Sequence, residues 1–255
     1  MQNVAAIILA AGKGTRMKSN RAKVLHEIVE VPMIRYVVKT ALTVVDEVVV
    51  VVGHEAESVL KALASYASSM LRFAVQEEQL GTGHAVVCAM PKVSACIQDV
   101  VVLCGDTPLI KPTTVRGLID QHRARGGHLT LIATTLTEPV GYGRIVSDSH
   151  GDPICIVEES DASESEKKIR LVNTGTYCIN VAFLRKALAG LKNDNAQGEF
   201  YLTDVVERAY RDGKPAVLLE VDDTIQVLGV NTKEELAKAE RFAQQGHRGS
   251  GPKSP

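Results

Sequence analysis

Length, composition and charge set the first bounds on this protein. The chain has 255 residues, 45% hydrophobic and 23% charged, which is enough apolar material for one large domain or one domain with a small lobe. A formal net charge of -1 excludes a global electrostatic attraction to nucleic acid or to a membrane surface, so we expect neither as a partner. No apolar run approaches the ~20 residues that span a bilayer, and we expect a cytoplasmic protein.

The five cysteines indicate a reducing compartment. They form no C-x-x-C pair, and two of them, Cys104 and Cys178, lie inside apolar runs that are typical of strands. This pattern favours buried thiols over a disulfide framework or a zinc site.

The stretch around which the chain is organised lies near its start. Residues 4–9 form a continuous apolar run, typical of a strand that is buried on both faces of a parallel sheet. The run is followed by Ala10-Ala11-Gly12-Lys13-Gly14-Thr15-Arg16, in which small residues expose backbone N–H groups beside two cations. Because unpaired amides and cationic side chains both favour anions, we expect this loop to wrap phosphate groups.

The loop differs from the two commonest phosphate-binding motifs. A Walker A loop requires Gly-x-x-x-x-Gly-Lys-Ser/Thr, a spacing that does not occur here. The dinucleotide fingerprint requires a third glycine three residues after Gly14, where the chain has Met17. A P-loop NTPase and an ordinary NAD-binding protein are therefore disfavoured, and a plain glycine-rich turn stays open as the simpler interpretation.

Strands alternate with helices through the first half of the chain. Hydrophobic periodicity predicts helices over residues 32–42, 56–66, 83–90 and 113–125, and strands over 48–52, 71–75, 100–104 and 129–135. This alternation predicts right-handed βαβ units and an open, mostly parallel α/β sheet with flanking helices. Ligands of such sheets bind beyond the carboxyl ends of the strands, where the Gly12 loop, Gly53-His54 and Gly105-Asp106 all fall.

The character of the chain changes at about Pro139. Strand-like segments at 141–146, 153–158 and 171–179, with a charged segment at 159–170, predict a smaller mixed lobe over roughly residues 139–200. Helices over 181–188 and 202–210 and a strand over 216–221 should follow, which completes a domain over residues 1–230. A last helix is expected over 231–245, capped by Asn231 or Thr232, and a disordered tail over 246–255.

Asp106 and Asn231 are the candidate metal ligands. Asp106 follows a buried strand directly, and Asn231 stands where another short strand meets the last helix. Magnesium prefers one or two protein oxygens together with phosphate oxygens and water, so such a pair suffices. The simpler interpretations are a turn-forming aspartate and a helix N-cap.

Further binding candidates lie in later loops. The junction from Gln76 to His84 carries two glycines and a hydroxyl, so its amides can hold a phosphate or a base edge while Gln76 pairs with a nucleobase. Gly143 permits close approach of the backbone to a ligand, and Glu158 and Asn173 suit sugar hydroxyls and an acetamido group. Each of these also fits an ordinary turn, bulge or surface polar residue.

These residues favour transfer of a phosphoryl or nucleotidyl group. His54 and His84 are interpreted as structural, since no Ser/His/Asp or Cys/His arrangement for nucleophilic catalysis is visible. A glycine loop, cations and Asp106 instead suit a reaction that needs positioning and charge neutralisation more than a side-chain nucleophile.

Several motifs together resemble one enzyme family. The segment 9–17 with Lys23-Val-Leu-His26 is similar to the signature of sugar-nucleotide pyrophosphorylases. Further motifs follow the order of the N-acetylglucosamine-1-phosphate uridyltransferase branch, the N-terminal half of a bifunctional bacterial enzyme; they lie at 76–84, 105–109, 141–144, 156–158, 173–175, 195–199 and 229–231. The resemblance covers residues 4–245.

The resemblance implies a Rossmann-like nucleotidyltransferase fold whose smaller α/β lobe binds the sugar. It also implies magnesium-dependent attack of N-acetylglucosamine 1-phosphate on the α-phosphorus of UTP, which releases pyrophosphate and supplies UDP-N-acetylglucosamine for peptidoglycan and lipopolysaccharide precursors. The resemblance also implies which residue binds which group. The nucleotide would be bound by Leu9, Ala10, Ala11, Gly12, Gln76, Gly81 and Thr82, and its β- and γ-phosphates by Lys13 and Arg16. Lys23 would contact the transferred phosphoryl group, Asp106 and Asn231 would bind Mg²⁺, and the sugar would be bound by Gly143, Glu158, Asn173 and Thr174.

Two departures from the family pattern stand out. The family usually has proline before the lysine of the Lys23 motif, whereas this chain has Ala22, which predicts a less rigid loop that keeps its cation. The bifunctional enzymes continue into a left-handed β-helix with acetyltransferase activity and trimer contacts, and this sequence does not. We therefore expect no acetyltransferase activity and a monomer or weak dimer.

Three alternatives stay open at this point. A pyrophosphorylase for another sugar or nucleotide, such as glucose 1-phosphate with UTP or dTTP, differs by only a few substitutions. A glycosyltransferase that consumes UDP-sugars typically needs an Asp-x-Asp metal motif, which the sequence lacks. A nucleotide-sensing module would predict loss of the charge at Lys23 or Asp106, and both charges are present.

Overall fold

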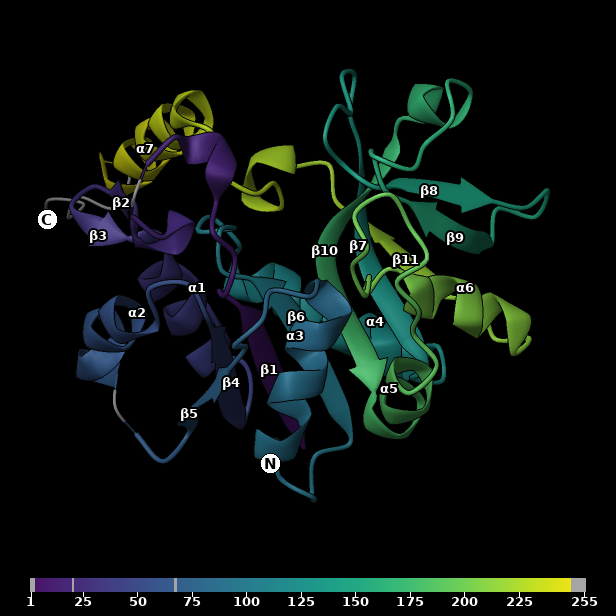
Figure 1. Ribbon diagram of the computed structural model, residues 1–255, viewed down its shortest axis with the longest axis horizontal. Helices are drawn as coiled ribbons and strands as arrows, with labels where there is room; N and C mark the ends of the chain where they lie inside the picture. Colours follow the sequence, from purple (N-terminus) through teal and green to yellow (C-terminus); the bar gives the residue numbers. More distant parts are fainter. Residues whose placement is uncertain (1–2, 20, 67, 249–255) are drawn as a thin grey trace, which may run out of the picture.

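A mixed sheet forms the centre of the fold (Figure 1). The computed structural model describes residues 3–19, 21–66 and 68–248. The main strands lie in the order β11-β7-β10-β6-β1-β4-β5, and β8 and β9 extend the sheet from β10. The strand bounds are β1 Val4–Leu9, β4 Glu47–Val52, β5 Leu71–Val75, β6 Asp99–Cys104, β7 Leu129–Thr135, β8 Arg144–Ser147, β9 Pro153–Val157, β10 Leu171–Asn180 and β11 Val217–Glu220.

Helices cover both faces of this sheet. Apolar side chains of α3 (Thr82–Ala89), α5 (Val181–Leu188) and α6 (Asp204–Arg211) pack on one face. Those of α1 (Met33–Leu42), α2 (Ala56–Leu63) and α4 (Pro112–Ala124) pack on the other. The expected open, mostly parallel α/β sheet with flanking helices is therefore confirmed.

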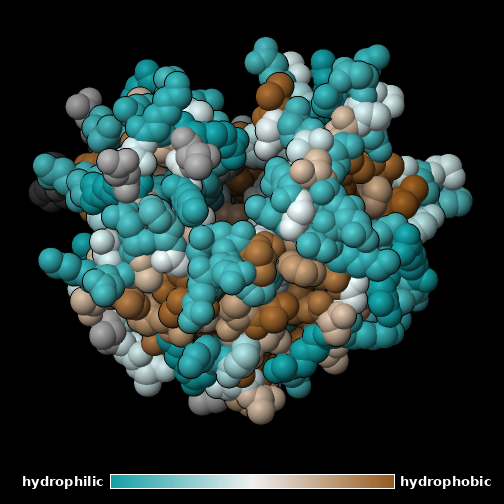
Figure 2. All heavy atoms as spheres, viewed as in Figure 1, coloured by the Kyte–Doolittle hydropathy of each residue, from teal (hydrophilic) through white to brown (hydrophobic). Residues whose placement is uncertain are grey.

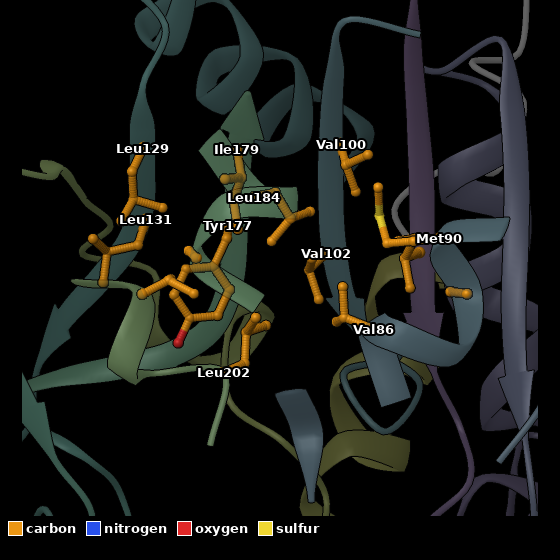
Figure 3. Packing of buried hydrophobic residues seen from close by; sticks show 14 of the residues in the cluster. Val86, Met90, Val100, Val102, Leu129, Leu131, Tyr177, Ile179, Leu184 and Leu202 are labelled. Carbon is orange, nitrogen blue, oxygen red and sulfur yellow. The ribbon is translucent and has the colours of Figure 1, made fainter. Parts of the chain in front are cut away.

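The apolar run at the start of the chain lies at the middle of these layers. β1 pairs in parallel with β4 on one side and with β6 on the other. Ala5 and Ile7 belong to the core on the α3 side, whereas Ala6 and Ile8 belong to the core on the α1 side. Figure 3 shows the α3-side core, where side chains of β6, β7 and β10 meet those of α3 and α5. A strand covered on both faces needs apolar residues at every position, which explains the unbroken run.

β10 departs from the parallel pattern. It runs antiparallel between β6 and β7, so residues 171–180 lie inside the main sheet. Its side chains alternate between the two cores, with Tyr177 and Ile179 on one face and Cys178 on the other. The expected lobe over 139–200 is therefore too wide, because this strand and α5 after it pack into the main core. What projects from the sheet is the β8–β9 pair with the charged segment that follows it (Figure 1).

Two further segments differ from the expected bounds. Residues 141–143 form a turn before β8, because Gly141 has a positive φ of 82° that interrupts an extended strand. The last helix, α7 (Lys233–Arg248), continues past residue 245. Residues 246–248 are thus helical where a disordered tail was expected, and the rest of that tail, 249–255, lies outside the described residues.

α7 packs beside a short hairpin of β2 (Glu27–Ile28) and β3 (Val31–Pro32), as Figure 1 shows. At the hairpin tip, the Val29 amide donates a hydrogen bond of 3.2 Å to Glu240 Oε1. Since Asn231 lies just before α7 and Lys23 just before β2, this contact joins the two segments that carry them.

No helix within the described ranges is long and apolar enough to cross a membrane. The cysteines are free thiols. Cys178 is buried as expected for a residue in an apolar strand, whereas Cys96 is exposed.

Candidate functional site

A cleft of about 410 Å³ opens at the edge of the sheet where the parallel strands end. Leu9 and Cys104 are register partners at the ends of β1 and β6, so the segments that follow both strands leave at this edge. Figure 2 shows a hollow between the side that carries α7 and the side that carries β8 and β9. The expected site residues that line the cleft are Leu9, Ala10, Ala11, Gly12, Arg16, Lys23, Gln76, Gly81, Thr82, Asp106, Gly143, Glu158, Asn173, Thr174 and Asn231.

Lys13 is the exception among the expected site residues. It is exposed and does not line the cleft, whereas Arg16, three residues later, does. Gly14 adopts a positive φ of 65°, and a Cβ there would clash with Cβ of Lys23. The chain therefore turns closely over Lys23 at Gly14, and Arg16 rather than Lys13 reaches the cleft.

The cations meet the candidate metal ligands inside this cleft. The Lys23 ammonium donates a hydrogen bond to Asp106 Oδ2 and another, of 3.0 Å, to Asn231 Oδ1. Arg16 Nη2 donates to the same Asn231 oxygen at 2.8 Å. Three segments that are far apart in the chain thus bring two cations, one carboxylate and one amide oxygen to a single point.

A capping arrangement frees the Asn231 side chain for this role. Thr232 Oγ1 accepts a hydrogen bond from the Glu235 amide at 3.1 Å, and Glu235 Oε2 accepts from the amides of Thr232 and Asn231 at 3.0 and 2.6 Å. This is a capping box in which Thr232 is the N-cap of α7. Because Thr232 caps the helix, the interpretation of Asn231 as a mere N-cap is not supported by the structure.

Whether a divalent metal fits here depends on these oxygens. Among the described residues, no group of three or more His, Cys, Asp or Glu side chains could hold a metal ion. Asp106 and Asn231 instead supply one anionic and one neutral oxygen that already share a cation, the Lys23 ammonium. This donor pair fits a hard cation such as Mg²⁺, which completes its shell with phosphate oxygens and water.

The loop before Lys23 is tied down by a side chain from the next βα unit. The Ala22 amide donates a hydrogen bond to Glu55 Oε2. Glu55 has a positive φ of 54° at the start of α2, which turns its carboxylate back toward this loop. Proline has no N–H to donate, so alanine at this position permits a tether that the family's usual residue excludes. The expected loss of rigidity is therefore offset by this hydrogen bond.

One end of the cleft is built from the Gln76–Thr82 junction. Gln76 is only 3% exposed, and its Nε2 donates to the Gly81 carbonyl oxygen at 3.0 Å. Thr82 Oγ1 accepts a hydrogen bond of 2.9 Å from the Leu202 amide, which ties the start of α3 to the segment before α6. His84 does not itself line the cleft, and its Nδ1 lies 3.1 Å from Nε2 of Gln76, which does.

Glu158 and Asn173 bring polar groups to the other end of the cleft. Burial raises the pKa of Glu158, although a 3.2 Å hydrogen bond from Thr203 Oγ1 acts in the opposite direction. Asn173 Oδ1 accepts from the Gly175 amide at 3.0 Å, and the pairing of β10 with β7 shifts register just after Asn173. Thr174 donates its hydroxyl proton to the Ile132 carbonyl at 2.9 Å, so this hydroxyl is not available as a donor to a sugar.

The register shift in β10 depends on a glycine. Gly175 has a positive φ of 77°, and a Cβ there would lie 2.7 Å from Cys104 Sγ. Cys104 itself lines the cleft, and burial raises the pKa of its thiol to about 12. It therefore stays protonated at neutral pH and is no nucleophile, in agreement with the sequence interpretation.

The structure adds Tyr142 to the site, which sequence reasoning missed. Tyr142 lines the cleft between the two glycines of the 141–143 turn, and burial, with the nearby carboxylates of Glu235 and Asp106, raises its pKa to about 12. The turn is held by Arg144, which is 1% exposed, pairs with Glu159 at 2.7 Å and donates to the Tyr142 carbonyl. The flanking glycines were the only sequence signal for this tyrosine.

The fold and the cleft define a class. A mostly parallel sheet with a glycine-rich loop after its first strand, and cations beside a carboxylate at the same edge, is the arrangement of a nucleotidyltransferase. Such a site supplies positioned charges rather than a nucleophile, and among the described residues that line this cleft the one thiol, Cys104, is kept protonated by burial.

Known proteins are similar to this chain. A family model described as the MobA-like NTP transferase domain matches residues 6–152. The bifunctional protein GlmU of Geobacter metallireducens is 48% identical over 246 residues, which are 96% of this chain and 51% of that protein. The bifunctional protein GlmU of Desulfotalea psychrophila is 44% identical over 238 residues, which are 93% of this chain and 69% of that protein.

The chain therefore belongs to the MobA-like NTP transferase family and is a relative of the GlmU proteins. It spans about half the length of the Geobacter relative, 51%. A solved structure from Bacillus anthracis, assigned as a glucose-1-phosphate thymidylyltransferase in complex with a sucrose, has a TM-score of 0.76 over 94% of this chain and 95% of that chain. At 20% identity, this likeness supports the fold alone.

Proposed function

We propose that the protein is a uridylyltransferase that converts UTP and N-acetylglucosamine 1-phosphate to UDP-N-acetylglucosamine and pyrophosphate. The observation that carries the proposal is the convergence of Lys23 and Arg16 on Asp106 and Asn231 in a cleft that also holds Gln76 and Glu158. The motifs shared with the uridyltransferase branch and the identity to the GlmU proteins support the choice of substrates.

The proposed reaction needs no protein nucleophile. A phosphate oxygen of the sugar phosphate forms a bond to the α-phosphorus of UTP, and the bond from that phosphorus to the bridging oxygen of pyrophosphate breaks. Both substrates are anions, so their approach and the developing charge must be neutralised. Lys23 would meet the transferred phosphoryl group, and Arg16 the β- and γ-phosphates, with Lys13 contributing from outside the cleft.

Transferases of this kind generally use a divalent metal, and we propose Mg²⁺ held by Asp106 and Asn231. The bound ion would supply positive charge to the phosphate oxygens of both substrates. In the ion's presence, the Lys23 ammonium and Arg16 guanidinium would exchange their contacts with Asp106 and Asn231 for contacts with substrate phosphates.

The two ends of the cleft would select the two substrates. Backbone groups of Ala10, Ala11 and Gly12, with Gln76 and Gly81, would bind the uracil, and Leu9 and Thr82 would line its pocket. At the other end, the Glu158 carboxylate would accept hydrogen bonds from sugar hydroxyls. The Asn173 amide and backbone groups at Gly143 and Thr174 would hold the N-acetyl group and ring.

The test is pyrophosphate release with Mg²⁺, UTP and three sugar phosphates: N-acetylglucosamine, glucosamine and glucose 1-phosphate. We expect a strong preference for the acetylated sugar, because the Asn173 amide would hydrogen-bond the acetamido group. A preference for glucose 1-phosphate would contradict the proposed sugar substrate but would leave the proposed nucleotidyl transfer standing. Release with none of the three would overturn the proposal, and a nucleotide-sensing module would replace it.

A further inference from the structure

Two acceptors hold one end of the buried Gln76 amide. One amide atom lies 3.0 Å from the Gly81 carbonyl oxygen and 3.1 Å from His84 Nδ1. A backbone carbonyl can only accept, so the atom that faces it must be the amide nitrogen, a donor. The same nitrogen then donates to His84 Nδ1, which must carry a lone pair and no proton.

This geometry defines the protonation of the His84 ring. With Nδ1 as acceptor, the ring proton of the neutral imidazole stands on Nε2. Nε2 lies 3.7 Å from Cys88 Sγ, an acceptor one helical turn further along α3. The Gly81 carbonyl is itself held in place, since it also accepts from the Ala85 amide at 3.1 Å. Both acceptors around the Gln76 nitrogen are therefore fixed by α3.

We propose that His84 is a positioning residue that selects the nucleobase by fixing the orientation of the Gln76 amide. The inference rests on the proposed function, in which Gln76 contacts the base of UTP. Among the described residues, no hydrogen bond to the side-chain oxygen of Gln76, Oε1, is present, so this oxygen is the group left to meet a base in the cleft.

An amide oxygen in this place discriminates between the two pyrimidines. Uracil carries N3–H, a donor that the oxygen accepts, whereas cytosine presents an unprotonated N3 that the oxygen repels. Accepting cytosine would require the amide to flip. The flip would put its oxygen against the Gly81 carbonyl, and His84 could pair with the flipped amide only by moving its ring proton from Nε2, where it faces Cys88 Sγ, to Nδ1. Gln76 is too buried, at 3% exposed, for water to offset these costs. His84 is one of the two groups that penalise this flip.

The test compares kcat/KM for UTP and for CTP, each with N-acetylglucosamine 1-phosphate and Mg²⁺. His84→Leu removes the Nδ1 acceptor, and we expect the UTP/CTP ratio to fall by about tenfold, since loss of one buried hydrogen bond is of this size. His84→Asn places an acceptor near the former Nδ1 and should restore most of the ratio. His150→Leu, in an exposed turn, is the matched control and should leave the ratio unchanged.

The outcomes separate this inference from the proposed function. A wild-type preference for UTP that His84→Leu leaves intact would overturn the role of His84 and leave the uridylyltransferase proposal standing. A wild-type protein that uses neither nucleotide would overturn the proposed function, and the inference with it. A fall in the ratio that His84→Asn does not reverse would also contradict the acceptor role.

A second measurement observes the His84 ring directly and needs no turnover. In protein labelled with ¹⁵N at histidine, the imidazole nitrogen shifts report which ring nitrogen carries the proton. We expect the His84 ring to carry its proton on Nε2 and none on Nδ1, and the spectrum of His84→Asn assigns the signal. A ring protonated on Nδ1, alone or in the charged form, would overturn the inference because Nδ1 could not accept from Gln76.

Discussion

The two ends of strand β6 hold an aspartate each, in very different surroundings. Asp99, where β6 begins, is 7% exposed and lies 3.5 Å from His122 Nε2 and 3.6 Å from Arg123 Nε. Asp106, just after the strand ends, bonds to Lys23 and lines the cleft. Both carboxylates therefore face cations, but only Asp106 does so at a cavity.

The difference lies in where the partners come from. His122 and Arg123 are neighbours on α4, so one helix packed on the sheet supplies both of these partners of Asp99. Lys23 belongs to the loop region after β1, and its contact with Asp106 spans 83 residues of sequence. The Lys23–Asp106 pair joins distant segments across a cleft, so its members can give up their mutual contact for contacts with a ligand. The partners of Asp99 come from one helix packed on the sheet, and these contacts contribute to stability. Burial beside a charge does not by itself mark a functional residue.

Replacement of each aspartate by its amide gives the largest expected contrast. Asp106→Asn should lower kcat by about 10³-fold, because it removes the charge that we assign to the metal. Asp99→Asn, at the other end of the same strand, should leave kcat within about twofold, since no ligand reaches it. Steady-state pyrophosphate release measures both. Equal losses in the two variants would end the distinction between the ends of β6.

The two lysines near the phosphate loop sharpen the same contrast. Lys23→Ala should lower kcat by about 10²-fold and change KM for UTP much less, because we assign its charge to the transferred phosphoryl group. Lys13→Ala should change either constant by only a few-fold, since its side chain is exposed outside the cleft. A large loss with Lys13→Ala would mean that the loop carries this lysine into the cleft when substrate binds.

Glu158→Gln separates function from stability at one position. Loss of the carboxylate should raise KM for the sugar phosphate by about tenfold. Because burial raises the native pKa of Glu158, its ionised form costs stability, so the variant should unfold at higher temperature than wild type. This gain should grow as the pH rises above about 4.3, the pKa in the unfolded chain, and vanish below it. An unchanged KM would exclude Glu158 from the sugar pocket.

The smallest effect is expected for the contribution of Asp99, at the start of β6, to the free energy of unfolding. Burial alone would raise the pKa of Asp99, but its contacts with His122 and Arg123 outweigh this and lower the pKa. Asp99→Asn should therefore reduce the free energy of unfolding by about 1 kcal/mol at pH 7. The contribution of a lowered acid is complete above the unfolded pKa of about 3.9 and is lost as the pH falls through the native value. Urea unfolding at pH 7 and at pH 3 checks this, and a difference that does not shrink between pH 7 and pH 3 would contradict it.

Much of the first half of the molecule could be predicted from its sequence. The bounds of β1, β5 and β7 match their apolar runs, because each strand is short, continuous and closed by a polar or glycine-containing segment. In a parallel sheet the strand ends coincide at one edge, so order along the chain was enough to bring the Gly12 loop and Asp106 together.

The arrangement of the strands in the second half of the chain could not be predicted from the sequence in the same way. An apolar run does not reveal strand direction, so the antiparallel insertion of β10 between β6 and β7 was out of reach. The Arg144–Glu159 pair and the turn that carries Tyr142 depend on long-range packing that composition does not encode. Lys13 illustrates the same limit on a small scale, because which of two nearby cations faces the cleft follows from the backbone turn at Gly14.

The hydrogen bond from Ala22 to Glu55 also gives this loop a spectroscopic signal of its own. Ala22 stands one residue before Lys23, and its amide donates its proton to the Glu55 carboxylate. A proline in this place has no amide proton, and the loop would then be silent at that position in amide-detected NMR. Here, a titration of ¹⁵N-labelled protein with UTP can follow this single N–H, so the chain carries a built-in reporter of ligand binding beside the ammonium that the proposed chemistry uses.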